Sequence, residues 1–125
     1  MAHFLYNTPM KHPFSVNGNF EIEKNGECFL NMKRIMLLKL IKEKGSINAA
    51  SKELKMSYQQ AWHFIKQMNE LSPIPLVVRQ RGGANGGGAD LTKFGEKAIF
   101  EFEKLMEQNK AYREELSGKL WLCFF

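Results

Sequence analysis

A short stretch from residue 57 to residue 66 carries the side chains with the most evident binding chemistry. Gln59 and Gln60 have amide groups that can form paired hydrogen bonds with the edge of an adenine base, and Lys66 can reach a phosphate or a guanine. We interpret this stretch as the part of a helix that reads bases in the major groove of duplex DNA. The alternative is a solvated surface, on which such residues are also common. The candidate contacts are Ser57, Tyr58, Gln59, Gln60, His63 and Lys66.

A second feature is the glycine-rich segment 81–88, which contains five glycines. Glycine-rich loops of nucleotide enzymes expose backbone amides to phosphate, but the Lys-Ser or Lys-Thr pair that closes such loops is absent here. With Arg79, Arg81 and Lys93 around it and Asn85 within it, the segment can instead lie along a DNA backbone or enter the minor groove. The alternative is an ordinary hairpin tip.

The basic residues are concentrated in the middle of the chain. The protein has 125 residues and a formal net charge of +5, and residues 31–95 contain 11 of the 18 lysines and arginines but 4 of the 13 acidic residues. This distribution is typical of a surface that faces phosphates, because backbone phosphates supply most of the non-specific affinity for nucleic acid. A solvated basic face without a partner is the alternative.

Other classes of function find little support in the sequence. We predict no enzyme and no metal or cofactor site, because paired carboxylates, a nucleophile with a base, and metal-ligand spacings are all absent. His63 has no carboxylate at a spacing that would make it a catalytic base. Cys28 and Cys123 are too few for a disulfide framework, so we treat both as structural thiols. Without a bilayer-length apolar run or a signal-like start, we expect a cytoplasmic protein with no membrane partner.

Local patterns predict the elements that must position the candidate residues. Three short β-type stretches, Phe14–Val16, Phe20–Glu23 and Cys28–Leu30, are separated by Asn-Gly pairs at 17–18 and 25–26. Asn-Gly is the strongest short hairpin signal. We therefore expect β-hairpins before residue 31.

Three helices are predicted next, each from a capping residue and an apolar stripe. Their ranges are Met32–Glu43 after Asn31, Ile47–Leu54 after Ser46, and Tyr58–Leu71 after Ser57. The third helix would bury Ala61, Ile65 and Met68 and leave Gln59, His63, Lys66 and Glu70 on the opposite face. Trp62 borders the buried stripe, so we expect it to pack rather than to touch DNA. Ser46, at the start of the preceding helix, completes this set of candidate contacts.

The remaining residues predict a hairpin and a long final helix. Leu76–Gln80 and Ala89–Leu91 are expected to be strands joined by the glycine-rich segment, and a helix is expected from Thr92 to about Leu116, before an apolar tail. This order of elements is that of a winged helix-turn-helix, in which the second helix of the pair enters the major groove. We thus predict a mainly α fold with small β elements, an N-terminal β-hairpin and a long C-terminal dimerisation helix.

The final helix carries a pattern of its own. Ala98, Phe102, Leu105, Asn109, Tyr112 and Leu116 recur at spacings of four and three, which is the seam of a coiled coil. We expect a homodimer with Phe102, Leu105, Asn109, Tyr112 and Leu116 at the interface, the alternative being that the seam packs only within its own domain. The chain would then divide into an N-terminal segment at 1–19, partly ordered, a DNA-binding domain at 20–95, and a dimerisation helix with its tail at 96–125.

Several blocks of residues also resemble a known family when they are taken together and in order. Gly45 to Ser51, Met56 to Trp62 and Met68 to Leu71 are followed by the glycine-rich segment and by Leu91 to Gly95. Over about residues 20–115 the chain resembles the N-terminal DNA-binding domain of the molybdate-dependent ModE regulators. It is also similar, more distantly, to the LysR-type helix-turn-helix.

The resemblance implies a homodimeric transcription factor whose winged domains sit on a two-fold DNA site, with the long final helix in the dimer contact. Full-length members continue into molybdate-binding domains, whereas this chain ends at Phe125. We therefore expect a sequence-specific regulator of ModE type that lacks the molybdate-sensing domains. The alternative is a protein-interaction module that has kept the winged fold and lost DNA binding.

Overall fold

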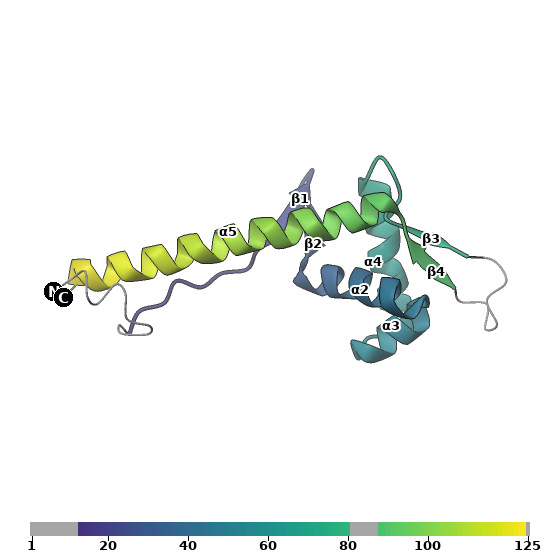
Figure 1. The fold of residues 1–125 in the computed structure, drawn as a ribbon, viewed down its shortest axis with the longest axis horizontal. Helices are drawn as coiled ribbons and strands as arrows, with labels where there is room; N and C mark the ends of the chain where they lie inside the picture. Colours follow the sequence, from purple (N-terminus) through teal and green to yellow (C-terminus); the bar gives the residue numbers. More distant parts are fainter. Residues whose placement is uncertain (1–12, 81–87, 125) are drawn as a thin grey trace. The chain divides into compact units, whose positions relative to one another are not determined.

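The computed structural model describes residues 13–80 and 88–124, in which helices predominate (Figure 1). The described chain forms two compact units, one spanning Glu21–Glu103 and the other combining the residues before Glu21 with those from Lys104 onward. In chain order the elements are β1 (Glu21–Lys24), β2 (Glu27–Asn31), α2 (Met32–Lys44), α3 (Ile47–Glu53), α4 (Tyr58–Leu71), β3 (Val77–Arg79), β4 (Ala89–Leu91) and α5 (Lys93–Phe124).

The three short helices begin where the capping residues predict. The side chains of Asn31, Ser46 and Ser57 each accept a hydrogen bond from the backbone N–H three residues later, which satisfies a donor that the helix itself cannot use. Helix α2 ends at Gly45, which takes the left-handed conformation (φ 67°) that favours glycine. The predictions for these helices are thereby confirmed to within a residue at each end.

The core of the larger unit lies between the three helices and the wing. Helix α2 contributes Ile35, Leu37, Leu38 and Ile41, all completely buried. Helix α4 buries Ala61, Ile65 and Met68, as its apolar stripe predicts. Burial of such side chains stabilises the fold by about 1.5–3 kcal/mol each, which makes this core the main source of the unit's stability.

A β-hairpin precedes the helices and is joined to them by a buried arginine. Strands β1 and β2 pair antiparallel around Asn25-Gly26, and both turn residues have positive φ, as a two-residue hairpin turn requires. The Arg34 guanidinium, on α2, donates to the Cys28 carbonyl at 2.7 Å and to Gln67 Oε1 at 2.6 Å. These bonds connect β2, α2 and α4 in one network.

Strands β3 and β4 form the wing, an antiparallel hairpin that projects beside the helices (Figure 1). The predicted strand Leu76–Gln80 is one residue shorter at each end in the structure, and Leu76, which precedes it, is completely buried. Beyond the strands, Gln80 N donates to the Gly88 carbonyl at 2.9 Å, and Ala89 N donates to the Gly45 carbonyl at 3.0 Å. The second bond ties the wing to the turn between α2 and α3.

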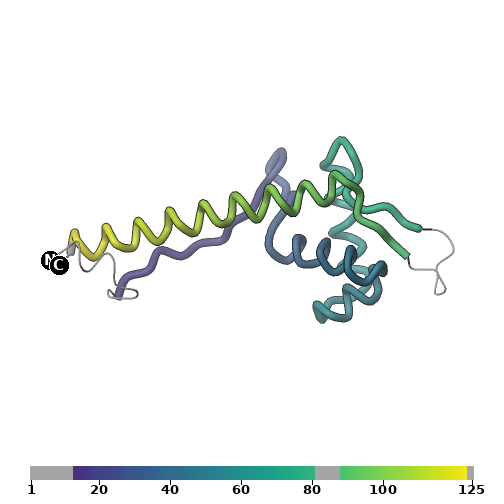
Figure 2. Tube along the Cα trace, in the orientation of Figure 1, coloured from purple at the N-terminus to yellow at the C-terminus, as the bar shows by residue number. Residues whose placement is uncertain are grey.

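The smaller unit differs from the prediction in two ways. Residues 13–20 form no strand and no hairpin at Asn17-Gly18, but run along the C-terminal half of α5 (Figure 2). Helix α5 does not stop near Leu116 but continues to Phe124. Both differences meet at Ser117, whose Oγ donates to the Arg113 carbonyl at 2.9 Å and accepts from Val16 N at 2.8 Å. The Ser117 hydroxyl therefore has a hydrogen-bond partner within α5, and it also holds the extended segment 13–20 against this helix.

Candidate nucleic-acid interface

The first turns of α4 present a polar surface next to the wing. Gln59, His63 and Lys66 are exposed, as the sequence predicts for the face opposite the buried stripe, and Gln60 is exposed as well. Ser57 is exposed too, but its hydroxyl already accepts from Gln60 N at 3.0 Å. The structure therefore brings the predicted residues of this helix together and gives Ser57 a capping role that the sequence also indicated.

Arg79 joins the end of β3 to the same helix. Its guanidinium carbon lies 4.1 Å from the centroid of the Trp62 ring, and its Nη2 donates to Tyr58 Oη at 3.4 Å. Tyr58 and Trp62 are four residues apart and so share a face of α4. Trp62 is half-buried, which agrees with the expected packing role, but the side chain that it contacts here is a cation of the wing.

Asn69 fixes the other end of the wing strand, a role that sequence reasoning missed. Its Oδ1 accepts from Leu76 N at 2.8 Å and from Val77 N at 3.3 Å, while its amide nitrogen donates to the Val77 carbonyl at 3.0 Å. A half-buried asparagine eight residues before a strand is no recognised sequence signal. The chain path through Pro73 and Pro75 had to be known before this contact could be found.

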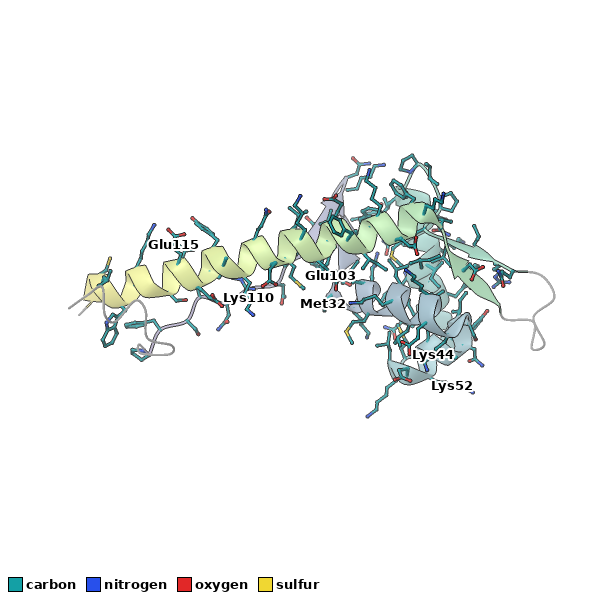
Figure 3. The ribbon with its side chains drawn as sticks, in the orientation of Figure 1. Met32, Lys44, Lys52, Glu103, Lys110 and Glu115 are labelled. Atoms are coloured by element: carbon teal, nitrogen blue, oxygen red, sulfur yellow. The ribbon has the colours of Figure 1, made fainter. Side chains whose placement is uncertain are left out.

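The other predicted contacts are spread over neighbouring elements. Lys93 is exposed at the start of α5, whereas Ser46 is half-buried, caps α3 and pairs with Gly88. Arg81 and Asn85 lie outside the described residues. Lys52 of α3, exposed and labelled in Figure 3, was not among the predicted contacts. Lys52 lies on α3, the first helix of the helix-turn-helix pair, which contacts the DNA backbone while the second helix enters the groove. This position is the signal that could have identified Lys52.

Charge on this surface is not neutralised by carboxylates. The ion pairs of the described residues involve Lys39, Lys42, Lys44 and Lys119. In the part of the chain that the structure describes, Lys52, Lys66, Arg79 and Lys93 make no ion pair. These cations can therefore pair with an external anion without first giving up an internal partner.

The predicted dimer residues have different environments on α5. Leu105 and Tyr112 are 41% and 56% exposed, so both side chains are open to a second copy in the single chain. Asn109 accepts from Arg113 Nε at 2.9 Å. Leu116 is half-buried. Phe102 is completely buried in the single chain, so its ring has no surface to offer a second copy, and we assign it to the core instead.

Three further features concern metal ligands, membrane spans and cysteine chemistry in the described residues. They contain no group of three or more His, Cys, Asp or Glu side chains that could hold a metal ion. None of the helices described is long and apolar enough to cross a membrane. Burial raises the pKa of the Cys28 thiol, which is half-buried in β2, and this disfavours the reactive thiolate.

These observations define a class of protein. Two helices joined by a short turn, the second with an exposed polar N-terminal face, and a β-hairpin at its side constitute a winged helix-turn-helix, as predicted. The chain belongs to the bacterial regulatory helix-turn-helix proteins of the lysR family, whose family model matches residues 32–96.

Several curated relatives confirm the resemblance to ModE regulators. Transcriptional regulator ModE of Haemophilus influenzae is 43% identical over 84 residues, or 67% of this chain and 32% of the relative. Molybdenum transport protein ModE of Azotobacter vinelandii is 42% identical over 91 residues, covering 73% and 34%. The DNA-binding transcriptional dual regulator ModE of Escherichia coli K12 is 44% identical over 87 residues, covering 69% and 33%. The matched region spans about a third of the length of these relatives.

Proposed function

We propose that the chain binds duplex DNA as a transcriptional regulator, with the N-terminal end of α4 in the major groove and the wing against the adjacent backbone. The observation that carries this proposal is the exposed polar face of α4 with Arg79 of the wing held against it. Lys52 on α3 and Lys93 on α5 add two cations that, like Arg79, make no ion pair among the described residues. Helix-turn-helix proteins use such a face to read base edges and use flanking cations to bind phosphates. Family membership and the names of the relatives support the same conclusion.

The proposed contacts have separate duties. Gln59 and Gln60 read bases, while Tyr58, His63 and Lys66 line the same groove. Ser46 and Ser57 cap α3 and α4 and so fix where these helices begin. In the proposed complex both serines lie near the DNA backbone. The phosphate contacts come from Arg79, Lys93, Lys52 and, from the sequence alone, Arg81 and Asn85.

The proposal also assigns duties to the parts of the chain. Residues 1–19 are an N-terminal segment, residues 20–95 bind DNA, and residues 96–125 hold two copies of the chain together as a dimer. Leu105, Asn109, Tyr112 and Leu116 form the contact between copies. The chain has no catalytic role and works in the cytoplasm, where a bacterial regulator meets its DNA. Family membership makes a pure protein-interaction module the less favoured alternative.

Salt dependence is the direct test of DNA binding. The full chain is titrated into a labelled duplex of random sequence at several sodium chloride concentrations. Because each neutralised phosphate releases counterions, the logarithm of the binding constant should fall linearly with the logarithm of salt, by about 0.9 per phosphate contact. Binding that ignores salt, or no binding, would contradict the proposal and favour the interaction module.

Base reading by α4 is tested with Gln59→Ala and Gln60→Ala on the duplex selected from a random pool. Each change should cost about 1–3 kcal/mol at one base position and relax the preference there. Gln108→Ala, which removes an exposed glutamine from α5, is the matched control and should leave the preference unchanged. Uniform losses over all duplexes would show that α4 does not read bases.

A further inference from the structure

The contact between Arg79 and Trp62 differs from the other stacked arginine in this protein. Arg34 also lies over a ring, with its guanidinium carbon 4.8 Å from the centroid of Phe64, but it is buried and donates to two backbone carbonyls and to Gln67. Those bonds engage both terminal nitrogens of Arg34 inside the protein. Arg79 is exposed instead, and in the described structure it donates only to Tyr58 Oη at 3.4 Å, a long bond.

A π face holds a guanidinium in a particular way. The ring attracts the cation through its electron-rich face, so the planar N–H donors at the guanidinium edge stay available for a further ligand. A carboxylate partner would occupy those donors and cancel the charge, and Arg79 makes no ion pair among the residues described. The arrangement therefore fixes the side chain and preserves its charge.

The position of the Arg79 guanidinium is suited to binding a phosphodiester. Arg79 ends β3, and the ring and hydroxyl that hold it come from the first two turns of α4, next to Gln59. In the proposed complex, a guanidinium held between the wing and α4 would lie toward the DNA strand that borders the major groove. Its free edge matches the paired oxygens of a phosphodiester.

We propose that Trp62 is a positioning residue for DNA binding, which holds the Arg79 guanidinium ready to bind a backbone phosphate beside the groove that α4 enters. This rests on the proposed function. A long side chain that is already held in its bound geometry loses less rotamer freedom on binding, and that saving strengthens the complex. Tyr58 supports the same geometry from one turn earlier on α4.

The test is a double-mutant cycle on the full chain, with a labelled random-sequence duplex as the probe and sodium chloride as the variable. The variants are Trp62→Leu, Arg79→Ala, their combination, and Trp62→Phe, which keeps a π face. Lys110→Ala, which removes an exposed cation from the C-terminal half of α5 (Figure 3), is the matched control for charge. Circular dichroism checks folding, and Trp62→Met replaces Trp62→Leu if the latter does not fold.

Arg79→Ala should reduce the salt slope by about one unit, and Lys110→Ala should not change it. Trp62→Leu should weaken binding about two- to five-fold, the range expected for one exposed cation–π contact, and move the slope toward that of Arg79→Ala. In the Arg79→Ala background the same change should have no further effect, and Trp62→Phe should restore most of the affinity. If Trp62 only stabilised α4, Trp62→Leu would not change the salt slope, and its effect would not depend on Arg79.

Two results would overturn the inference in different ways. Equal losses for Trp62→Leu with and without Arg79, or no loss in either case, would show that Trp62 does not act through Arg79, and DNA binding itself would stand. A wild-type chain that shows no salt-dependent binding would remove the proposed function and this inference with it.

Discussion

At the scale of single residues, Gly95 lies where α5 packs against the base of the wing. It is buried at the start of α5, and a Cβ built there would lie 2.9 Å from Leu91 Cγ and would also overlap the Leu76 carbonyl oxygen. Backbone cannot give way as a flexible side chain can. Only glycine therefore lets the helix pack this close to the base of β3 and β4.

Replacing Gly95 with alanine should destabilise the fold by about 1–3 kcal/mol, because the added methyl group forces the wing and the helix apart. Denaturant unfolding measures the change. Gly18→Ala is the matched control, since a Cβ at Gly18 meets nothing within 4 Å, and it should have little effect. An unchanged midpoint for Gly95→Ala would mean that the wing can shift freely.

At the scale of elements, capping sets where the recognition helix begins. Ser57 accepts from Gln60 N at 3.0 Å, so one hydroxyl satisfies a helix donor and also fixes the backbone that presents Gln59 and Gln60. A short polar side chain at this position is needed for the helix and lies on the surface proposed to face DNA. Two substitutions separate these duties.

Ser57→Ala should cost about 1 kcal/mol of stability through the lost cap. Ser57→Asp should keep the cap, because a carboxylate accepts the same hydrogen bond and interacts favourably with the helix N-terminus, and yet weaken DNA binding by repelling phosphates. Thermal unfolding and duplex titration are measured on both variants. If Ser57→Asp binds DNA as tightly as the wild type, this end of α4 does not face the duplex.

At the scale of the whole molecule, the proposed function needs two copies of the chain. A two-fold protein gains affinity by engaging two half-sites about one helical turn apart. Helix α5 offers Leu105 and Tyr112 as exposed apolar side chains for such a contact. Their exposure in the single chain means that substitution should spare its fold.

Leu105→Glu combined with Tyr112→Glu should convert a dimer into a folded monomer, because like charges would then meet across the seam. Sedimentation equilibrium measures the association, and the monomer should lose the affinity gained from the second half-site. Ala111→Glu, an exposed position off the seam, adds the same charge as a control and should leave the dimer intact. A wild-type monomer at tens of micromolar would contradict the dimer proposal.

The local features of this protein could be predicted from neighbouring residues alone. Asn31, Ser46 and Ser57 marked three helix starts, and Asn25-Gly26 marked the hairpin, because caps and two-residue turns depend on side chains within a few residues. The exposed face of α4 followed from helical periodicity in the same way. These features gave the fold and most of the candidate interface.

Contacts between distant residues were decided only by the tertiary structure. Ser117 and Gly118 locally predict the end of a helix, but α5 continues to Phe124. In the structure, Ser117 accepts a hydrogen bond from Val16, which is 101 residues away in the sequence. The periodicity of α5 put Phe102 on a dimer seam, while packing buries it completely in the chain. Trp62 could be placed beside Arg79 only once the path of the wing was known. Local patterns specify which face of an element is apolar, and the packing of elements decides which neighbour covers it.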